Sequence, residues 1–465
     1  MKKGGNLQNP ELTEQELRDL ESCYCSYGDT VHYSQHPIIF EHCEGVWLYD
    51  LKGKPYLDMQ MWYSAVNFGY KNKEIENAHA LQMERLPQIA SQYLHKEKIL
   101  LAAAIVQETE KRFSEKGRVH FNVGGAQAIE DSLKLVRMNQ RGKSLMIAFM
   151  GGYHGRTLAA TEITSSYRYR KKYGHFGNRA LFIPFPYCYR CIYDKKYPAC
   201  EYYCADQFKK LFETEYYGIV DKEREAEFAA FYAEPVQATG GYIVPPPEYF
   251  MRIADVLKQH GILFVDDEIQ MGFYRTGRLW AMEHFGIKPD IIAFAKSLTN
   301  GLNPLSGIWA RESLISPTVF QPGSTHSTFS SNPLGTAAGL ATIELIKMND
   351  FSTIAQEKGA YLVSALKDLQ KKYSVIGDVD GLGLAVRVEM TKADRFTPDR
   401  ELTDAMFQEG LKGELLADGK EYGLILDVGG YYKNVFTLAP ALTISFEEMD
   451  LFLTLFEQIL VKCGN

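Results

Sequence analysis

Short apolar runs alternate with amphipathic stretches from about residue 76 to residue 340, and this alternation limits the possible folds more than any other feature. Such a run is typical of a buried strand, and a longer stretch with apolar residues three and four apart is typical of a helix. Their repetition predicts a mostly parallel sheet with helices on both faces. The runs that we interpret as strands are residues 118–122, 145–149, 229–233, 263–265 and 291–294.

The two ends of the chain have a different pattern. Thr13 and Glu16 form a predicted capping box at the start of a helix, and residues 45–58 resemble a hairpin with a turn near Gly53. Helical stretches at 337–347 and 360–372 precede a strand-like run at 383–389. We therefore predict an α/β fold in which residues 76–335 form the large domain, while residues 1–75 and 336–465 contribute to a smaller α+β domain.

Composition narrows the class of protein. With 465 residues, 46% of them hydrophobic and 23% charged, the chain is an ordinary globular protein. A formal charge of −7 argues against nucleic acid as its main partner. The sequence has no apolar run of membrane-spanning length, and its first fifteen residues lack the apolar segment of a signal peptide. We expect a cytoplasmic enzyme that acts on small molecules.

Four of the eight cysteines cluster in the pattern C-x2-C-x8-C-x3-C, at Cys188, Cys191, Cys200 and Cys204. Four thiolates at this spacing are able to hold a structural zinc ion. The middle gap is shorter than in common zinc modules, however, and the surrounding residues are rich in tyrosine and proline. We therefore favour four reduced thiols without a metal.

A lysine and an aspartate follow two of the predicted strands. Lys296 comes directly after the run 290–295, and Asp267 ends the run 262–267, 29 positions earlier, with room for a helix between them. Parallel strands open at one edge of a sheet, where ligands bind. Both residues suit pyridoxal 5'-phosphate (PLP), because an amine forms a Schiff base with it and a carboxylate pairs with its pyridinium nitrogen. The alternative is that they only mark the ends of strands.

Two glycine-containing turns follow other strands. Gly125 and Ala126 precede the helical stretch 129–137, where backbone N–H groups and the helix dipole favour an anion. No dinucleotide or Walker pattern is present, which argues against a nucleotide. In the second turn, Tyr153 is suited to stack on a flat ring, and Arg156 to clamp a carboxylate. The alternative for this turn is an exposed glycine-rich loop.

With these residues assembled, the chain resembles the class III aminotransferases, PLP enzymes of fold type I, over residues 45–442. The most specific segment runs from Asp267 through Gln270 and Gly277 to Lys296. The resemblance implies that Asp267 pairs with the pyridine nitrogen, Gln270 contacts the ring hydroxyl and Lys296 holds the cofactor as a Schiff base. Gly125 and Ala126 match the phosphate-binding positions, and Tyr153 matches the aromatic residue that covers the ring.

A further motif concerns assembly. Residues 327–333, Ser-Thr-Phe-Ser-Ser-Asn-Pro, resemble a family motif whose threonine, here Thr328, reaches the phosphate of the neighbouring subunit's cofactor. The resemblance therefore implies a homodimer with shared active sites, and a tetramer is the larger assembly to consider.

The implied reaction is transamination. The amino group of an ω-amino acid, a diamino acid or an amine would pass to a 2-oxo acid, through the Lys296 Schiff base and pyridoxamine phosphate. Lys296 would act as the general base, a role that a lowered pKa favours. Alternatives on the same fold are an aminomutase, a decarboxylating transaminase and an epimerase. A catalytically silent relative would be expected to have lost the lysine or the aspartate, and both are present here. The glycine fingerprint of a Rossmann dehydrogenase is absent, which argues against that class of enzyme.

The sequence departs from the family where the substrate binds. Many members bind glutamate's α-carboxylate with an arginine at the position of Thr437, and neutralise it with a glutamate at the position of Thr239. Both charges are absent together, as expected if they form a pair, because a single buried charge would cost several kcal/mol. This puts the glutamate/2-oxoglutarate half-reaction in doubt.

Two residues point to the substrate class. Arg156 matches the family arginine that often binds a distal carboxylate. Tyr63 lies in a segment, 62–67, that resembles ornithine aminotransferase, where the matching tyrosine contacts the far end of the diamino acid. An ordinary core aromatic is the alternative for Tyr63. We predict an ω-amino donor, with the carboxylate of the acceptor held by Arg156.

Overall fold

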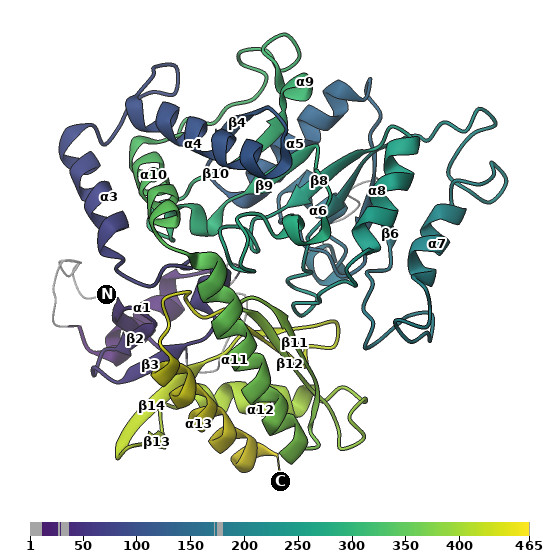
Figure 1. The fold of residues 1–465 in the computed structure, drawn as a ribbon. Helices are drawn as coiled ribbons and strands as arrows, with labels where there is room; N and C mark the ends of the chain where they lie inside the picture. Colours follow the sequence, from purple (N-terminus) through teal and green to yellow (C-terminus); the bar gives the residue numbers. More distant parts are fainter. Residues whose placement is uncertain (1–11, 27, 29–36, 172, 174–179, 465) are drawn as a thin grey trace.

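The computed structural model describes residues 12–26, 28, 37–171, 173 and 180–464, and consists of two lobes (Figure 1). The upper lobe in this view holds the large sheet, and the lower lobe holds two smaller sheets with the long C-terminal helices. Residues 1–11, which contain most of the segment examined for a signal peptide, lie outside the described residues. Among the described residues, no helix is long and apolar enough to cross a membrane.

The large sheet has seven strands, of which only β10 runs antiparallel to its neighbours. This confirms the predicted mostly parallel sheet. Each of the five strands predicted for this sheet lies within or coincides with an observed one, whereas the predicted run 383–389 begins two residues before β12 (Ala385–Met390). The order is β4 (Gly117–Asn122), β10 (Ser306–Arg311), β9 (Ile291–Phe294), β8 (Leu263–Asp267), β7 (Phe228–Ala233), β5 (Leu145–Phe149) and β6 (Ala180–Ile183).

Helices cover both faces of this sheet. Met146 and Ala148 of β5 pack in one apolar cluster with α5 (Gly125–Asn139) and α6 (Leu158–Ile163). Ile147 and Phe149 of the same strand pack in another, with α7 (Tyr203–Lys210) and α8 (Tyr249–Gln259). Successive side chains of a strand point to opposite faces, which is why an uninterrupted apolar run is required here.

The connection between β8 and β9 differs from the prediction. Instead of an α-helix, it contains turns and one 3₁₀ helix, η3 (Ala281–Phe285). Positive φ angles at Phe273 (54°), Tyr274 (66°) and Gly277 (87°) interrupt any helix there, because an α-helix needs negative φ. The strands are nevertheless parallel neighbours, with Val265 opposite Ile291, so Asp267 and Lys296 follow strands that end at the same edge.

The N-terminal and C-terminal parts of the chain share a five-stranded sheet. The predicted hairpin is confirmed as antiparallel β2 and β3, and β3 pairs in parallel with β14. The sheet contains, in order, β1 (Phe40–Glu44), β2 (Trp47–Asp50), β3 (Pro55–Asp58), β14 (Lys420–Ile425) and β13 (Leu415–Ala417). A four-stranded sheet contains β11 (Ile376–Leu382), β12 (Ala385–Met390), β16 (Val435–Leu438) and β15 (Val428–Gly429).

The predicted helices outside the large sheet are present. The capping box of Thr13 and Glu16 starts α1 (Glu14–Tyr24). The stretches 337–347 and 360–372 lie within α10 (Pro333–Met348) and α11 (Phe351–Lys372). The other long helices are α3 (Lys73–Arg85), α4 (Lys96–Phe113), α12 (Arg400–Leu411) and α13 (Phe446–Cys463). The domain boundaries after residues 75 and 335 stay a prediction.

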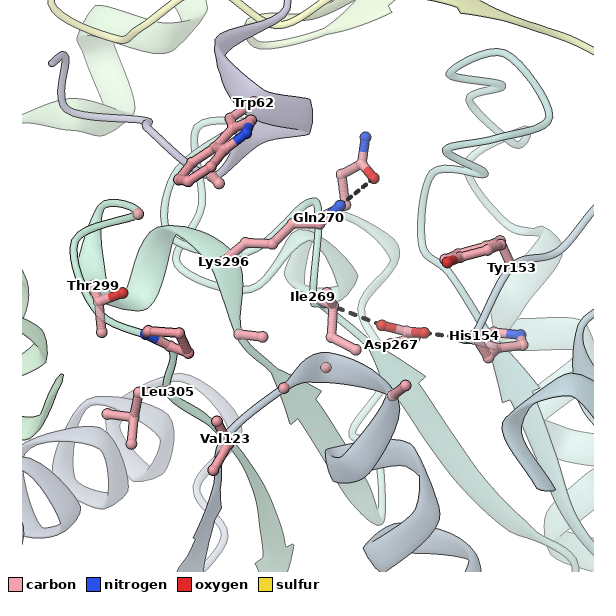
Figure 2. Close-up of a pocket in the computed structure, with 18 of the residues that line it drawn as sticks. Trp62, Val123, Tyr153, His154, Asp267, Ile269, Gln270, Lys296, Thr299 and Leu305 are labelled. Atoms are coloured by element: carbon pink, nitrogen blue, oxygen red, sulfur yellow. Dashed lines mark hydrogen bonds and ion pairs between the residues drawn. The ribbon is translucent and has the colours of Figure 1, made fainter. Parts of the chain in front are cut away.

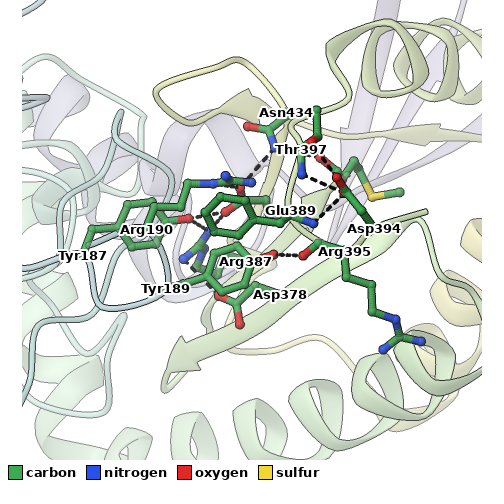
Figure 3. A network of polar contacts seen from close by, with 12 residues as sticks. Tyr187, Tyr189, Arg190, Asp378, Arg387, Glu389, Asp394, Arg395, Thr397 and Asn434 are labelled. Carbon is green, nitrogen blue, oxygen red and sulfur yellow. Dashed lines mark hydrogen bonds and ion pairs between the residues drawn. The ribbon is translucent and has the colours of Figure 1, made fainter. Parts of the chain in front are cut away.

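A buried ionic network joins the loop after β6 to β12 (Figure 3). The guanidinium of Arg387 donates to the Tyr187 hydroxyl and to Glu389, and its Nη1 lies 3.2 Å from Oδ2 of Asp378. Glu389 also accepts from Arg190 of the loop. Because the side chains of Arg387 and Glu389 are almost fully buried, these contacts fix how the two lobes meet.

Candidate active site

A cavity of about 370 Å³ opens where β4, β8 and β9 end (Figure 2). It brings together most of the residues singled out in the sequence. Those that line it are Gly125, Ala126, Tyr153, Asp267, Gln270 and Lys296. They come from four separate segments, which meet here because parallel strands end at one edge.

Lys296 is the first residue of a short 3₁₀ helix, η4 (Lys296–Thr299), with a positive φ of 44°. Its Nζ points toward Gln270 and donates to Oε1 of that side chain over 2.6 Å (Figure 2). Burial lowers the pKa of Lys296 to about 8, although nearby carboxylates, among them Asp267, raise it in part. The amine is therefore neutral in a sizeable fraction of molecules near neutral pH, as a nucleophile or a base must be.

Asp267 ends β8 and is almost completely buried. Its Oδ2 lies 2.7 Å from Nδ1 of His154, and its Oδ1 accepts from the backbone N–H of Ile269. Burial lowers the pKa of His154, but the hydrogen bond to Asp267 and nearby carboxylates outweigh this, so the pKa is raised overall. The contact with His154 holds the carboxylate in place at the end of β8, where it would pair with a pyridinium nitrogen.

His154 and Glu234 line the same cavity and were not predicted. Glu234 accepts from the backbone N–H groups of Tyr153 and Ala238, both over 2.9 Å. Burial raises the pKa of Glu234 to about 7. The sequence feature that could have identified His154 as a site residue is its position directly after Tyr153 in the glycine-rich turn.

The two residues predicted to bind an anion, Gly125 and Ala126, lie in the first turn of α5. The backbone N–H of Gly124 is not available to an anion, because it donates to Oε1 of Gln127 over 3.0 Å in a capping box. A Cβ on Gly125 would lie 3.1 Å from Cδ1 of Ile269, so the turn packs closely against the segment after β8. The next backbone N–H groups, from Gly125 and Ala126, lie at the cavity and at the positive end of the helix dipole.

Tyr153 and Arg156 differ in their position relative to the cavity. Tyr153 is half-buried and lines the cavity, and its stacking on a ring stays a prediction. Arg156 is exposed and does not line the cavity, and its guanidinium carbon lies 4.4 Å above the ring of Tyr169. The predicted clamp for a carboxylate is therefore not part of the cavity wall.

Tyr63 lies in a left-handed turn, α2 (Met61–Ser64), in which all four residues have φ between 44° and 64°. Such a turn is costly for residues with side chains and is often found at functional sites. Trp62 of this turn lines the cavity. Tyr63 is half-buried beside it, and burial, with a smaller effect of the Asp427 charge, raises its pKa to about 12.

Thr328 is exposed and does not line the cavity of its own chain. Its expected contact lies in a neighbouring subunit, so its role stays a prediction.

The two threonines that replace the charged pair lie close to the same glycine. Thr239 donates to the backbone oxygen of Gly151 over 3.2 Å, and Thr437 donates to Oδ2 of Asp427 over 2.5 Å. A Cβ on Gly429 would lie 3.1 Å from Cγ2 of Thr437 and 3.6 Å from the backbone oxygen of Thr239. The two positions are neighbours, as a paired Glu and Arg would need to be, but both side chains here are neutral.

The four clustered cysteines line one small cavity among tyrosine rings. Burial, with a smaller effect of the other thiols, raises the pKa of Cys188 to about 12 and that of Cys204 to about 11. A raised pKa disfavours the thiolate that binds metal. In the part of the chain that the structure describes, no group of three or more His, Cys, Asp or Glu side chains is placed to hold a metal ion.

A model of the aminotransferase class-III family matches residues 30–460. With the sheet and the lysine at its edge, this match defines a PLP-dependent enzyme of fold type I. The chain belongs to the class III aminotransferase family. The family, the fold class and the cofactor expected from the sequence are therefore confirmed.

The individual relatives have different activities. The chain is 32% identical to leucine/methionine racemase of Thermococcus litoralis, over 89% of this chain and 88% of that protein. It is 30% identical to ornithine aminotransferase 2 of Staphylococcus aureus, over 91% and 95%. Among solved structures, an amine transaminase from an uncultivated Pseudomonas species in its PLP-bound form matches with a TM-score of 0.84 and 25% identity, over 95% and 99%.

Proposed function

We propose that this protein removes and returns the Cα proton of a single amino acid substrate, and so acts as a racemase or epimerase. The observation that carries the proposal is the pair of neutral side chains at Thr239 and Thr437. A glutamate-dependent transaminase alternates between two substrates of different charge, and a switchable ion pair serves that alternation. An enzyme that acts on one substrate does not need an ion pair of this kind.

The similarity of this chain to two racemases supports the same proposal. Leucine/methionine racemase of Thermococcus litoralis and alanine/serine racemase of Pyrococcus horikoshii, at 32% and 30% identity, both match over most of this chain. The epimerase considered as an alternative from the sequence thus has better support than the transamination expected first.

The residues of the cavity fit PLP: a buried lysine, a buried carboxylate at a strand end and helix N–H groups beside a glycine. We assign Lys296 to hold the cofactor, Asp267 to pair with the ring nitrogen, Gln270 to contact the ring hydroxyl, Tyr153 to cover the ring, and Gly125 and Ala126 to bind the phosphate. When bound, PLP supplies the electron sink for the charge left at Cα.

Lys296 moves the proton. Its free amine would accept the Cα proton of the bound amino acid, and its lowered pKa suits this role near neutral pH. Gln270 holds Nζ in place. Asp267, which His154 contacts over 2.7 Å, would pair with the ring nitrogen. The Lys296 ammonium formed in this way would give a proton back to Cα, and inversion results when the substrate presents its other face to this group.

Transamination with an ω-amino donor is the second candidate. It is favoured by Tyr63, which follows the cavity-lining Trp62 in the left-handed turn, and by the relatives named ornithine aminotransferase 2 and probable 4-aminobutyrate aminotransferase. In this case the acceptor would be a 2-oxo acid other than 2-oxoglutarate, because the ion pair for glutamate is absent.

One experiment separates the two candidates. The holoenzyme is incubated in D₂O with single L-amino acids, without a 2-oxo acid, and the products are resolved by chiral chromatography and mass spectrometry. A racemase gives the D-enantiomer labelled at Cα over many turnovers. A transaminase stops after one equivalent of 2-oxo acid or aldehyde per site, and continues only when an acceptor is added. The second result would overturn the proposal.

We also propose that the protein is a homodimer, or a tetramer made of two such dimers. Large apolar side chains are exposed near the cavity and on the segment of Thr328, for example Trp62 at 58% and Phe329 at 71%. Exposed apolar groups of this size commonly mark a protein interface. If Thr328 completes the neighbour's site, mixed dimers of Thr328→Ala and Lys296→Ala chains should regain partial activity. Sedimentation of the protein as a monomer would contradict the proposal of a dimer.

A further inference from the structure

We propose that Asp131 is a positioning residue for the cofactor phosphate at two active sites. It holds the turn before α5, which leads to the phosphate-binding residues of its own chain. It also holds the segment of Thr328, which would enter the neighbouring subunit's site. The inference rests on the proposed roles of Gly125, Ala126 and Thr328 and on the proposed homodimer. Because Asp131 does not line the cavity, it acts through the residues that it contacts.

The carboxylate of Asp131 has a hydrogen-bond partner on each side. Asp131 belongs to α5, and its side chain is almost completely buried. Its Oδ2 accepts from Nδ2 of Asn122, and its Oδ1 accepts from the hydroxyl of Thr325 over 2.7 Å. Burial raises the pKa of Asp131, but the contacts with His120, Thr325 and Asn122 outweigh this, so the pKa is lowered overall. The carboxylate is therefore ionised, and its hydrogen bonds are stronger than those between neutral groups.

Asn122 connects this carboxylate to the phosphate turn. It ends β4, and its own Oδ1 accepts from the backbone N–H of Val123 over 2.8 Å. Val123 lines the cavity just before the turn (Figure 2). A rotated amide would place its oxygen against the carboxylate of Asp131 and its NH₂ group against the N–H of Val123. The carboxylate thus fixes the orientation of the amide that holds the start of the turn.

Thr325 connects the same carboxylate to the segment that contains Thr328. The hydroxyl of Thr325 donates to Asp131, as described above. At the other end of this segment, the backbone oxygen of Ser331 lies 2.8 Å from Nε2 of the buried His95. Thr328 is exposed between these two contacts. Asp131 therefore fixes one end of the exposed segment.

Two further contacts hold the segment and the carboxylate in place. The ring of His120 packs edge-on against Phe320, with centroids 5.5 Å apart, and its Nε2 lies 3.3 Å from Oδ2 of Asp131. The exposed Lys134 donates to the hydroxyl of Thr325 over 2.8 Å. The ring contact does not depend on the charge of Asp131. Loss of the carboxylate should therefore loosen the segment without detaching it.

The chemical consequence is that one carboxylate acts on two phosphate groups. A displaced turn would move backbone N–H groups away from the phosphate in the same chain, and a displaced segment would move Thr328 away from the phosphate in the neighbour. Groups that bind a ligand must stay within about 0.5 Å of the productive geometry, so small shifts are sufficient. The loss should concern the phosphate and not the ring of the cofactor.

The first test measures affinity for PLP and for pyridoxal, which lacks the phosphate. The cofactor-free protein is titrated with each ligand, and bound cofactor is followed by absorbance. In Asp131→Ala we expect the dissociation constant for PLP to rise by about fivefold or more, and that for pyridoxal by less than about twofold. Asp131→Asn keeps one acceptor and should lose less. Equal losses for the two ligands would overturn the role of Asp131.

Controls separate this effect from unfolding. Asp206→Asn, at an exposed aspartate of α7, should bind both ligands like the wild type. The melting temperature of each cofactor-free variant shows whether it is folded. If Asp131→Ala does not fold, Thr325→Val removes the hydroxyl on the side of the segment and leaves the carboxylate in place. It should still weaken the binding of PLP more than that of pyridoxal, and the opposite result would overturn the proposal.

Mixed dimers distinguish the two sites. A dimer with one Lys296→Ala chain has a single site that binds PLP covalently. Asp131→Ala in the chain that keeps Lys296 tests the turn, and the same change in the Lys296→Ala chain tests the segment. Both should weaken PLP binding at the remaining site, whereas Thr325→Val should do so mainly from the Lys296→Ala chain. An effect of Asp131→Ala from one chain only would overturn the action at two sites.

The outcome for Asp131 can be told apart from that of the proposed function. Binding is measured without turnover, so it does not depend on whether the enzyme is a racemase or a transaminase. Sedimentation as a monomer would refute the homodimer and the action on the neighbour's site together. A dimer in which Asp131→Ala binds PLP like the wild type would refute the role of Asp131 and leave the homodimer standing.

Discussion

The Nδ1 of His154 lies 2.7 Å from Oδ2 of Asp267, and both side chains are almost completely buried. Asp267 ends β8, while His154 belongs to the turn after β5, so the contact joins two of the segments that form the cavity. A buried carboxylate needs a partner of this kind to remain ionised. The histidine therefore acts through Asp267 on whatever the carboxylate binds.

We expect His154→Ala to weaken the retention of PLP without unfolding the protein. Loss of the histidine leaves the buried carboxylate short of a hydrogen bond and free to rotate, which weakens its pairing with the ring nitrogen. Dialysis followed by absorbance measurement of the bound cofactor should show a dissociation constant at least about tenfold higher. His154→Gln, which can still donate to Asp267, should be affected less. Equal retention in both variants would contradict this role.

The cofactor-free protein should capture PLP at a rate that depends on the pKa of Lys296. Below a pKa of about 8 the amine is mostly protonated, so the rate should rise by about tenfold per pH unit and level off above it. Stopped-flow absorbance measures the rate, and Lys296→Ala should show no slow covalent phase. A rate that still rises steeply above pH 9 would mean that the pKa is not lowered.

Gly125→Val should reduce the affinity for PLP more than Gly125→Ala. A Cβ at this position already lies 3.1 Å from Cδ1 of Ile269, so a methyl group needs a small shift and a branched side chain a larger one. The displaced turn would carry its backbone N–H groups away from the phosphate. Titration of the cofactor-free variants with PLP, and with pyridoxal as the control that lacks a phosphate, checks this expectation. Equal losses for both ligands would exclude the phosphate as the cause.

Arg387→Met should destabilise the protein by about 3–5 kcal/mol, because it leaves the buried carboxylate of Glu389 with one cationic partner fewer. Urea unfolding followed by tryptophan fluorescence measures the free energy of unfolding. The double variant Arg387→Met/Glu389→Met removes both charges and should lose less. A single variant as stable as the wild type would show that the network in Figure 3 does not hold the lobes together.

Features that depend on a few neighbouring residues were predictable from the sequence. Apolar runs specified the strands of the large sheet, and the parallel arrangement placed Asp267 and Lys296 at one edge. The capping box of Thr13 specified the start of α1. The connection after β8 was predicted wrongly as a helix, because its interruption depends on positive φ angles at Phe273 and Tyr274, residues without a turn-forming signal of their own.

The sequence by itself determined the sheet, its reactive edge and the cofactor, because strand periodicity and motif spacing are local properties of the chain. Only the tertiary structure decided which distant side chains meet. His154 and Asp267 are 113 residues apart, and Gln60 and Asp427 are 367 apart. Such contacts follow from strand register and from the packing of the two lobes, which no local pattern encodes.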